Sequence, residues 1–463
     1  MWYNGGVFSE RTARFVTQSE KHYIKMTETP LTKLIVTLGI PTTISMLVTN
    51  LYNMADTYFV GTLGESAQGA TGILFTLQAI IQAIAFMLGQ GAGTMVSKAL
   101  ADKNQKEASE YVSTGFFAGI FLGLLVTVGG FAFLDPFMRL LGSTDTILPY
   151  SRIYGACVLA TAPIVSASFV LNNTLRYEGK AIFAMFGLVS GGLLNIFGDW
   201  LLVMELDMGI LGAGLSTAVS QVVSFLVLLV FYMTKAQGKL SLAYISRDKR
   251  VYWNILTIGF PAVIRQGLSS ISGGLLNNLA KPFGDAAIAA MSVVNRFSAF
   301  VMCVGLGIGQ GYQPVAAFNY QAKRYDRVKK GLLITMAIGA GFILCLSVPG
   351  AIFADKIVYL FQKSPEVIRI GTTALRFSCA GVIFLALSVP VNMLYQSTRK
   401  PAICSFLSLL RSGLMFIPAL LVTTHFWGLL GIQISQPLAD MLTGLVSIPF
   451  IIAFLRKKDE DMD

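Results

Sequence analysis

Residues 39–61 read GIPTTISMLVTNLYNMADTYFVG, an apolar stretch that carries a carboxylate near its end. The segment 34–60 around it is long enough to cross a bilayer, because a spanning helix needs about 20 residues. Asn50, Asn53 and Asp56 follow one another at intervals of three residues, about one to three turns from the end of this segment. An ionisable group inside a span is costly and is usually retained for function. The stretch predicts a membrane helix whose polar stripe faces a cavity, although Asp56 could instead be a boundary residue that touches water.

The composition places the whole chain among integral membrane proteins. Hydrophobic residues make up 54% of the 463 residues, charged residues make up 13%, and the mean hydropathy is +0.66. A soluble domain has about 25% charged residues. Apolar runs of spanning length lie at 34–60, 68–97, 112–134, 152–173, 181–204, 210–234, 252–278, 287–317, 331–353, 367–395, 401–424 and 428–455. The predicted fold class is all-α, with twelve transmembrane helices.

The positions of Lys and Arg predict the orientation in the membrane. If the N-terminus is inside, 25 of the 35 basic residues fall in inner segments and six fall in outer loops. Cytoplasmic loops are the ones enriched in Lys and Arg, so both termini are expected in the cytoplasm. The same bias accounts for the net charge of +11, and no nucleic-acid partner is expected. Residues 1–30 are expected to be a polar leader, of which 1–25 could be an extension ahead of Met26, and 457–463 a charged tail.

The chain contains an internal repeat with a shift of 220 residues. The shift aligns GIP at 39–41 with GFP at 259–261, LGE at 63–65 with FGD at 283–285, and GQG at 89–91 with GQG at 309–311. It predicts two six-helix lobes, 31–234 and 252–456, joined by a cytoplasmic connector at 235–251. Because six is even, both lobes enter the membrane from the same side. Parallel repeats of this kind are typical of transporters that rock two lobes about a central site.

Polar residues in the fifth and sixth spans lie at a depth similar to that of Asp56. Asn195 and Asp199 stand at i and i+4 in NIFGD, on one helix face, and Thr217 follows in GAGLSTA. The shift pairs Asp56, Asn195 and Asp199 with Leu276, Met415 and Ala419. The acids therefore belong to one lobe only. This asymmetry predicts a functional polar site in the first lobe.

The chemistry of this site leaves two coupling ions open. The two carboxylates could exchange a proton as a coupled pair, or Asp56, Asn195, Asp199 and Thr217 could hold Na⁺ through their oxygens. No other cofactor is expected. Pro41 removes a backbone hydrogen bond and is either a hinge or an ordinary transmembrane proline. The expected substrate cavity includes Asn50, Asn53, Gln266, Asn277 and Arg296.

NLYNMADTYFVG, the paired GQG segments, LNNTLRYEGKAIFAM, NIFGD and GILGAGLSTA resemble the multidrug and toxic compound extrusion (MATE) family. The resemblance covers about residues 27–457 and is to the DinF-like and MepA-like bacterial members. It implies a V-shaped cleft in the bacterial inner membrane and secondary active export of amphipathic, often cationic, compounds in exchange for H⁺ or Na⁺ by alternating access.

The resemblance also implies roles for individual residues. DinF-like members form an ion or proton site in the first lobe, and its positions match Asp56, Asn195, Asp199 and Thr217. NorM-like members instead place acids in the seventh and tenth helices. Here Gln266 stands in the seventh helix and the tenth has no acid, so the resemblance does not extend to a cation site in the second lobe.

Two other classes of function have less support from the sequence. A lipid-linked saccharide or lipid flippase of the same superfamily is the runner-up, but it would need several basic residues in the cavity, and only Arg265, Arg296, Arg376 and Arg411 lie near spans. A membrane enzyme is not expected, because the sequence contains neither clustered carboxylates for Mg²⁺ nor a nucleophile paired with a base. The expected partners are small amphipathic drugs or toxins and membrane lipids, and the expected state is monomeric.

Overall fold

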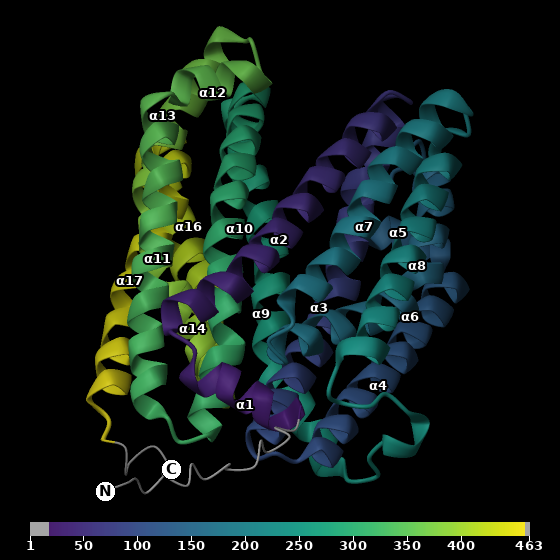
Figure 1. Cartoon of the computed structure of the whole chain (residues 1–463). Coiled ribbons are helices and arrows are strands. Elements are labelled where there is room, and N and C mark those ends of the chain that lie inside the picture. The colour runs from purple at the N-terminus through teal and green to yellow at the C-terminus, as the bar shows by residue number, and fades with distance from the viewer. Residues whose placement is uncertain (1–17, 459–463) are drawn as a thin grey trace, which may run out of the picture.

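The structure, a computed structural model, describes residues 18–458, so 1–17 of the expected leader and 459–463 of the expected tail lie outside it. Within the described range the regular elements are helices, and none is a strand. Figure 1 shows two lobes of long helices that come together at one end of the molecule, called the inner end, and diverge toward the other, called the outer end. This arrangement confirms the predicted all-α fold with a V-shaped pair of lobes.

Six long helical segments build the first lobe, and each matches one predicted span. They are α2 (Leu31–Gly61), α3 (Glu65–Ala101), α4 (Gln105–Ala132), α6 (Leu148–Tyr177), α7 (Ala181–Asp199) with its π-helical continuation η1 (Trp200–Glu205), and α8 (Gly209–Lys235). The short α5 (Leu134–Leu140) joins α4 to α6. The connector, with η2 (Leu242–Tyr244), follows α8 and returns along α4, where Ser241 N donates to Ser113 Oγ at 3.2 Å.

The second lobe also contains six segments, two of them divided by a turn of 3₁₀ or π-helix. They are α9 (Lys249–Ala280) with η3 (Lys281–Phe283), α10 (Asp285–Gln321), α11 (Tyr325–Ile352), α13 (Pro365–Gly381) with η4 (Val382–Phe384) and α14 (Leu385–Ser397), α15 (Pro401–Leu409) with η5 (Leu410–Met415) and α16 (Phe416–Trp427), and α17 (Leu429–Arg456). The short α12 (Ala354–Phe361) precedes α13. Eleven described segments are long and apolar enough to span a membrane. The twelfth, α9, has 32 residues but includes Arg265 and Gln266, which lower its hydropathy.

The two lobes repeat one another in detail. The short helices α5 and α12 begin 220 residues apart. Asn172 Nδ2 donates to the backbone oxygen of Ala184 at 3.0 Å, and Asn392 Nδ2 donates to that of Cys404 at 3.1 Å. These two bonds occupy equivalent positions under the 220-residue shift. The internal repeat predicted from the sequence is therefore also a repeat of tertiary contacts.

The first helix of each half crosses from one lobe to the other. The inner part of α2 packs against α10, where Gly39 faces Ile308, and its outer part packs against α7, where Val48 faces Gly192. The second half repeats this plan, because α9 packs against α3 and then against α15 and η5. Figure 1 shows α2 running obliquely between the lobes. The helix continues through Pro41, whose role as a hinge stays a prediction.

Glycines allow these crossing helices to approach very closely. A Cβ added at Gly91 would lie 2.0 Å from the backbone oxygen of Ile255, and one added at Gly311 would lie 3.0 Å from that of Ile35. The two contacts are related by the 220-residue shift. Small residues at helix contacts let backbones come together in membrane bundles, so the paired GQG segments hold the inner ends of the two lobes against each other.

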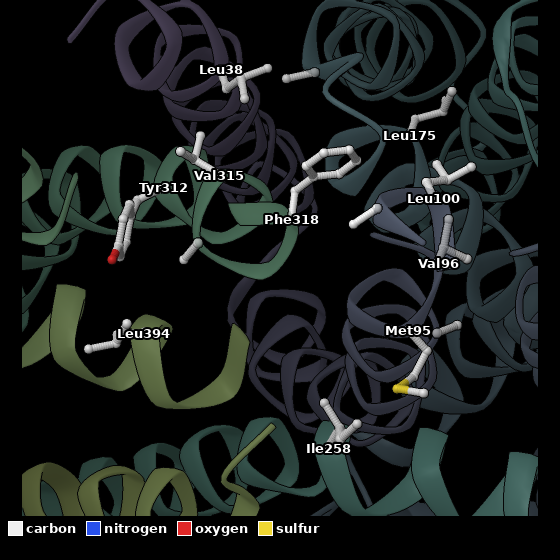
Figure 2. Close-up of a cluster of buried hydrophobic side chains, with 14 of the residues drawn as sticks. Leu38, Met95, Val96, Leu100, Leu175, Ile258, Tyr312, Val315, Phe318 and Leu394 are labelled. Atoms are coloured by element: carbon white, nitrogen blue, oxygen red, sulfur yellow. The ribbon is translucent and has the colours of Figure 1, made fainter. Parts of the chain in front are cut away.

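The distribution of buried side chains explains why the lobes join at one end only. The largest apolar cluster combines both halves, and Figure 2 shows Leu38 and Met95 of the first half near Ile258, Phe318 and Leu394 of the second. The outer ends have separate clusters, one within each lobe. The shared apolar core therefore lies at the closed end, and the outer ends are free to diverge.

The expected leader includes a helix, α1 (Gln18–Glu28), which lies at the closed end outside the membrane spans (Figure 1). The ring of His22 contacts Phe318 of α10 edge-on, with 5.2 Å between ring centroids. Lys25 Nζ donates to the backbone oxygen of Gly179 in the first lobe at 3.2 Å, and Asn319 Nδ2 of the second lobe donates to that of Met26 at 3.0 Å. The helix α1 thus contacts the inner ends of both lobes.

Candidate functional site

Four polar side chains from four helices meet toward the outer end of the first lobe. Tyr154 OH donates to Asp56 Oδ1 at 2.8 Å and lies 3.0 Å from Thr217 Oγ1. Asn195 Nδ2 donates to Thr217 Oγ1 at 3.2 Å. All four side chains are buried, with at most 6% exposure. The structure brings Asp56, Asn195 and Thr217 together, as the sequence predicted, and adds Tyr154.

Asp199 lies one turn beyond Asn195 on the same face of α7, and it is fully buried. In the described part of the chain, neither carboxylate oxygen of Asp199 has a hydrogen-bond partner, and neither does Asn195 Oδ1. Ser216 lies beside Asp199, but its hydroxyl donates instead to the backbone oxygen of Asn195 at 3.0 Å. A buried ionised carboxylate without a partner is costly. These three oxygens are therefore suited to a bound proton or a hard cation.

The motifs did not single out Tyr154, although a signal for it was present. Its counterpart under the 220-residue shift is Ala374. The hydroxyl is therefore confined to the first lobe, like the carboxylates of Asp56 and Asp199. Comparing the two halves at every polar position within the spans would have selected it.

A cavity of about 330 Å³ lies beside this polar cluster, a size within the range of small-molecule sites. Its walls come mainly from the first lobe and are completed by α9 and α10. The predicted residues that line it are Asn50, Asn53, Asn195, Thr217 and Gln266. Among described residues, Asp56 and Asp199 do not belong to the lining. The carboxylates thus lie behind an amide and a hydroxyl rather than in the cavity wall.

Two of the expected cavity residues lie elsewhere. Asn277 is exposed and does not line the cavity; it lies eleven residues after Gln266, so α9 carries it about 16 Å farther out. Arg296 is also exposed and lies one turn before Ala299, the outermost lining residue of α10. The structure therefore corrects the expectation for both residues. Their positions in the seventh and eighth spans did not show how far along these helices the cavity extends.

The second lobe contains a different charged pair. Asp440 of α17 accepts a hydrogen bond from Arg411 Nε of η5 at 2.8 Å, and its side chain is 5% exposed. Gln436 Nε2 also donates to Asp440 Oδ1, at 3.0 Å. The carboxylate is therefore neutralised by a cation of the chain itself.

Two parallel six-helix lobes, with a central cavity and a buried polar cluster in one lobe, form an architecture typical of membrane transporters. The profile of the MatE family matches residues 41–201 and 261–421, one segment in each lobe. The chain belongs to this family, the multidrug and toxic compound extrusion family that the sequence motifs resemble.

Relatives match the chain over almost its whole length. Multidrug export protein MepA of Staphylococcus saprophyticus is 25% identical over 424 residues, which cover 91% of this chain and 93% of the relative. The protein of the same name from Staphylococcus aureus is 26% identical over 436 residues, covering 93% and 95%. A solved structure described as the outward-facing conformation of a multidrug resistance MATE family transporter aligns with a TM-score of 0.89 at 24% identity, covering 96% of this chain and 100% of that one.

Proposed function

We propose that this protein is a secondary active antiporter that exports amphipathic, often cationic, compounds in exchange for H⁺ or Na⁺. The MatE fold, the names of the MepA relatives and a cavity of small-molecule size support multidrug export. The observation that carries ion coupling is the set of three buried oxygens, two on Asp199 and one on Asn195, that lack a hydrogen-bond donor among the described side chains.

Coupling follows from the position of these oxygens next to the cavity. A proton or Na⁺ at Asp199 removes the cost of an unpaired buried charge, so the ion and the packing of α2, α7 and α8 influence each other. Asn195 and Thr217 line the cavity while they contact the polar cluster. Binding of substrate against these two side chains therefore acts on the ion site, and the reverse effect is equal by linkage.

The orientation is part of this proposal. The closed end contains α1, the connector and the end of α17, which are the segments rich in Lys and Arg. We infer that this end faces the cytoplasm and that the lobes open outward. A cysteine placed in the connector should resist an impermeant thiol reagent in intact cells and react in everted vesicles. Labelling from outside would contradict the orientation.

Purified protein in liposomes tests the coupling with imposed pH and Na⁺ gradients applied separately. Asp56→Asn and Asp199→Asn keep the size of each side chain but remove its charge, so we expect each to reduce gradient-driven export of a fluorescent cation at least tenfold. Drug binding should persist. Asp145→Asn is the matched control, because Asp145 belongs to the same lobe but pairs with Arg139 on the surface.

The outcome separates the alternatives. Wild-type rates from both variants, at equal incorporation into liposomes, would show that the carboxylates do not couple export to an ion. Export that responds to neither gradient would contradict the antiporter proposal as a whole. The flippase alternative has less support, because the described lining of the cavity includes one basic residue, Arg176, rather than a cluster of them.

A further inference from the structure

Arg176, at the end of α6, is the only charged residue among the described side chains that line the central cavity. It is 5% exposed, and its position in the LNNTLRYEGK motif places it at the inner end of the cavity, near Ala181 and Ala184. The Asp56 and Asp199 carboxylates lie behind the wall at the outer end. The wall that a substrate meets therefore has one fixed charge, and that charge is positive.

The guanidinium group of Arg176 has few partners for its five donors. Nη1 donates to Asn173 Oδ1 at 3.3 Å, and Nη2 donates to Gln313 Oε1 at 3.5 Å. Both distances are long for bonds from a cation, which are typically about 2.7–2.9 Å to a carboxylate. Within residues 18–458, Nε has no partner, and no carboxylate forms an ion pair with this side chain. Arg176 is thus a buried cation whose charge the chain leaves uncompensated.

The repeat argues against a purely structural role for this charge. The 220-residue shift pairs Arg176 with Gln396 of α14. Gln396 Nε2 donates to Gln90 Oε1 at 2.8 Å, and Gln396 Oε1 accepts from Gln313 Nε2 at 2.8 Å. A neutral amide therefore occupies the equivalent position in the second lobe and makes shorter contacts, one of them to the first half. The fold does not need a guanidinium group at this point of the repeat.

We propose that the inner end of the cavity is a carboxylate subsite, in which Arg176 binds a single carboxylate carried by an amphipathic substrate. The planar guanidinium fork matches a carboxylate in geometry, and its long contacts from Nη1 and Nη2 to two amide oxygens hold it only weakly within the chain. One cation balances one negative charge, so a monoanionic group fits better than a pyrophosphate. The inference rests on the proposed function only in taking this cavity as the place where substrate binds.

The dimensions of the cavity suit a molecule with a polar group at each end. Both Ala181 and Asn195 line it, and they are separated by about 21 Å along α7 at 1.5 Å per residue. Phe86, Phe169 and Leu188 form part of the wall. The preferred substrate is therefore an amphipathic compound with an apolar body and a carboxylate at the inner end, whether or not it also carries a cationic group at the outer end.

Two dyes that differ in one group test this subsite. A rhodamine with a free carboxylate and the methyl ester of the same dye share the cationic ring system, so only the carboxylate distinguishes them. Fluorescence anisotropy with the purified full-length protein, without any gradient, gives the affinity for each dye. Arg176→Gln should weaken binding of the carboxylate dye about 10- to 100-fold, the range for hydrogen bonds to charged groups. Binding of the ester should change less than about threefold.

Control variants separate binding from structure. Arg176→Lys keeps the charge but loses the fork, and should give an intermediate affinity for the carboxylate dye. Arg376→Gln makes the same chemical change at an exposed arginine of α13 that does not line the cavity, and should leave both affinities unchanged. Equal weakening for both dyes in Arg176→Gln would show that Arg176 only holds the lobes in place and would overturn the subsite. Unchanged affinity for the carboxylate dye would overturn it as well.

The two proposals fail independently in these experiments. Ion-driven export of the ester dye by the wild-type protein tests the antiporter function and does not involve the carboxylate. If that export is absent while Arg176→Gln still discriminates between the dyes, the subsite stands and ion coupling is refuted. If export of the ester is normal while the two dyes respond alike to Arg176→Gln, the antiporter stands and the subsite is refuted.

Discussion

Replacing Gly259 with alanine should strain the contact that joins the two lobes at their inner ends. A Cβ at this position of α9 would lie 1.8 Å from the backbone oxygen of Met87 in α3, whereas real Cβ contacts are essentially never below 3.0 Å. The helices would therefore have to separate by at least about 1.2 Å. The atom in the way belongs to the backbone of a long helix, so a change of side-chain rotamer cannot relieve the clash.

The magnitude follows from two opposing effects. Overpacking of a buried contact costs about 1–3 kcal/mol, and the rigidity of α3 places this contact at the upper end. Alanine stabilises a helix interior by about 1 kcal/mol relative to glycine. The net loss of unfolding free energy should be about 2 kcal/mol. Gly267→Ala is the matched control, because Gly267 lies in the same helix with no atom within 4 Å of an added Cβ, and it should gain up to about 1 kcal/mol.

Thermal unfolding of the purified variants in one detergent measures this difference. We expect Gly259→Ala to unfold at a lower apparent Tm than the wild type, and Gly267→Ala at the same or a higher one. A cysteine at the inner end should also react faster with a thiol reagent in Gly259→Ala, because the lobes separate there. If the two alanine variants had the same Tm and the same reactivity, the close approach of α9 and α3 would not hold the lobes together.

Two further predictions concern charged groups outside the candidate ion site. Asp440→Asn should destabilise the protein by about 3 kcal/mol because it leaves Arg411 without its partner. Adding Arg411→Met should recover at least half of this loss. Equal stability of the single and double variants in thermal unfolding would contradict the prediction. Burial, with Lys180 and Lys25 nearby, lowers the pKa of His22 from 6.5 to about 3. Protonation of His22 therefore opposes docking of α1. The free energy of docking is most favourable above pH 6.5 and becomes less favourable as the pH falls toward 3, with about 2 kcal/mol lost by pH 5. A nitroxide label on the exposed face of α1 should become more mobile from pH 8 to pH 5 in the wild type but not in His22→Phe, and equal mobility at both pH values in the wild type would refute the prediction.

The sequence by itself determined the class of fold and most of the polar cluster. Spans are readable because each must supply about 20 apolar residues, and the orientation is predicted because Lys and Arg concentrate in cytoplasmic loops. The 220-residue repeat predicted two parallel lobes. Polar residues that break this repeat, such as Asp56 and Asp199, identified the lobe with the polar cluster. An ionisable group inside a span is costly and is usually retained for function.

Tertiary structure alone decided which polar groups meet and which face the cavity. Helix periodicity gives the face and depth of a residue but not the neighbouring helix, so the crossing of α2 and α9 between lobes was not predicted. For the same reason, the contact of Tyr154 with Asp56 and the ion pair of Arg411 with Asp440 in the second lobe were not predicted. Arg176 stands near a loop in the sequence, where a basic residue is ordinary. Only the packing of both lobes around the end of α6 buries its charge, and that burial makes it a candidate binding group.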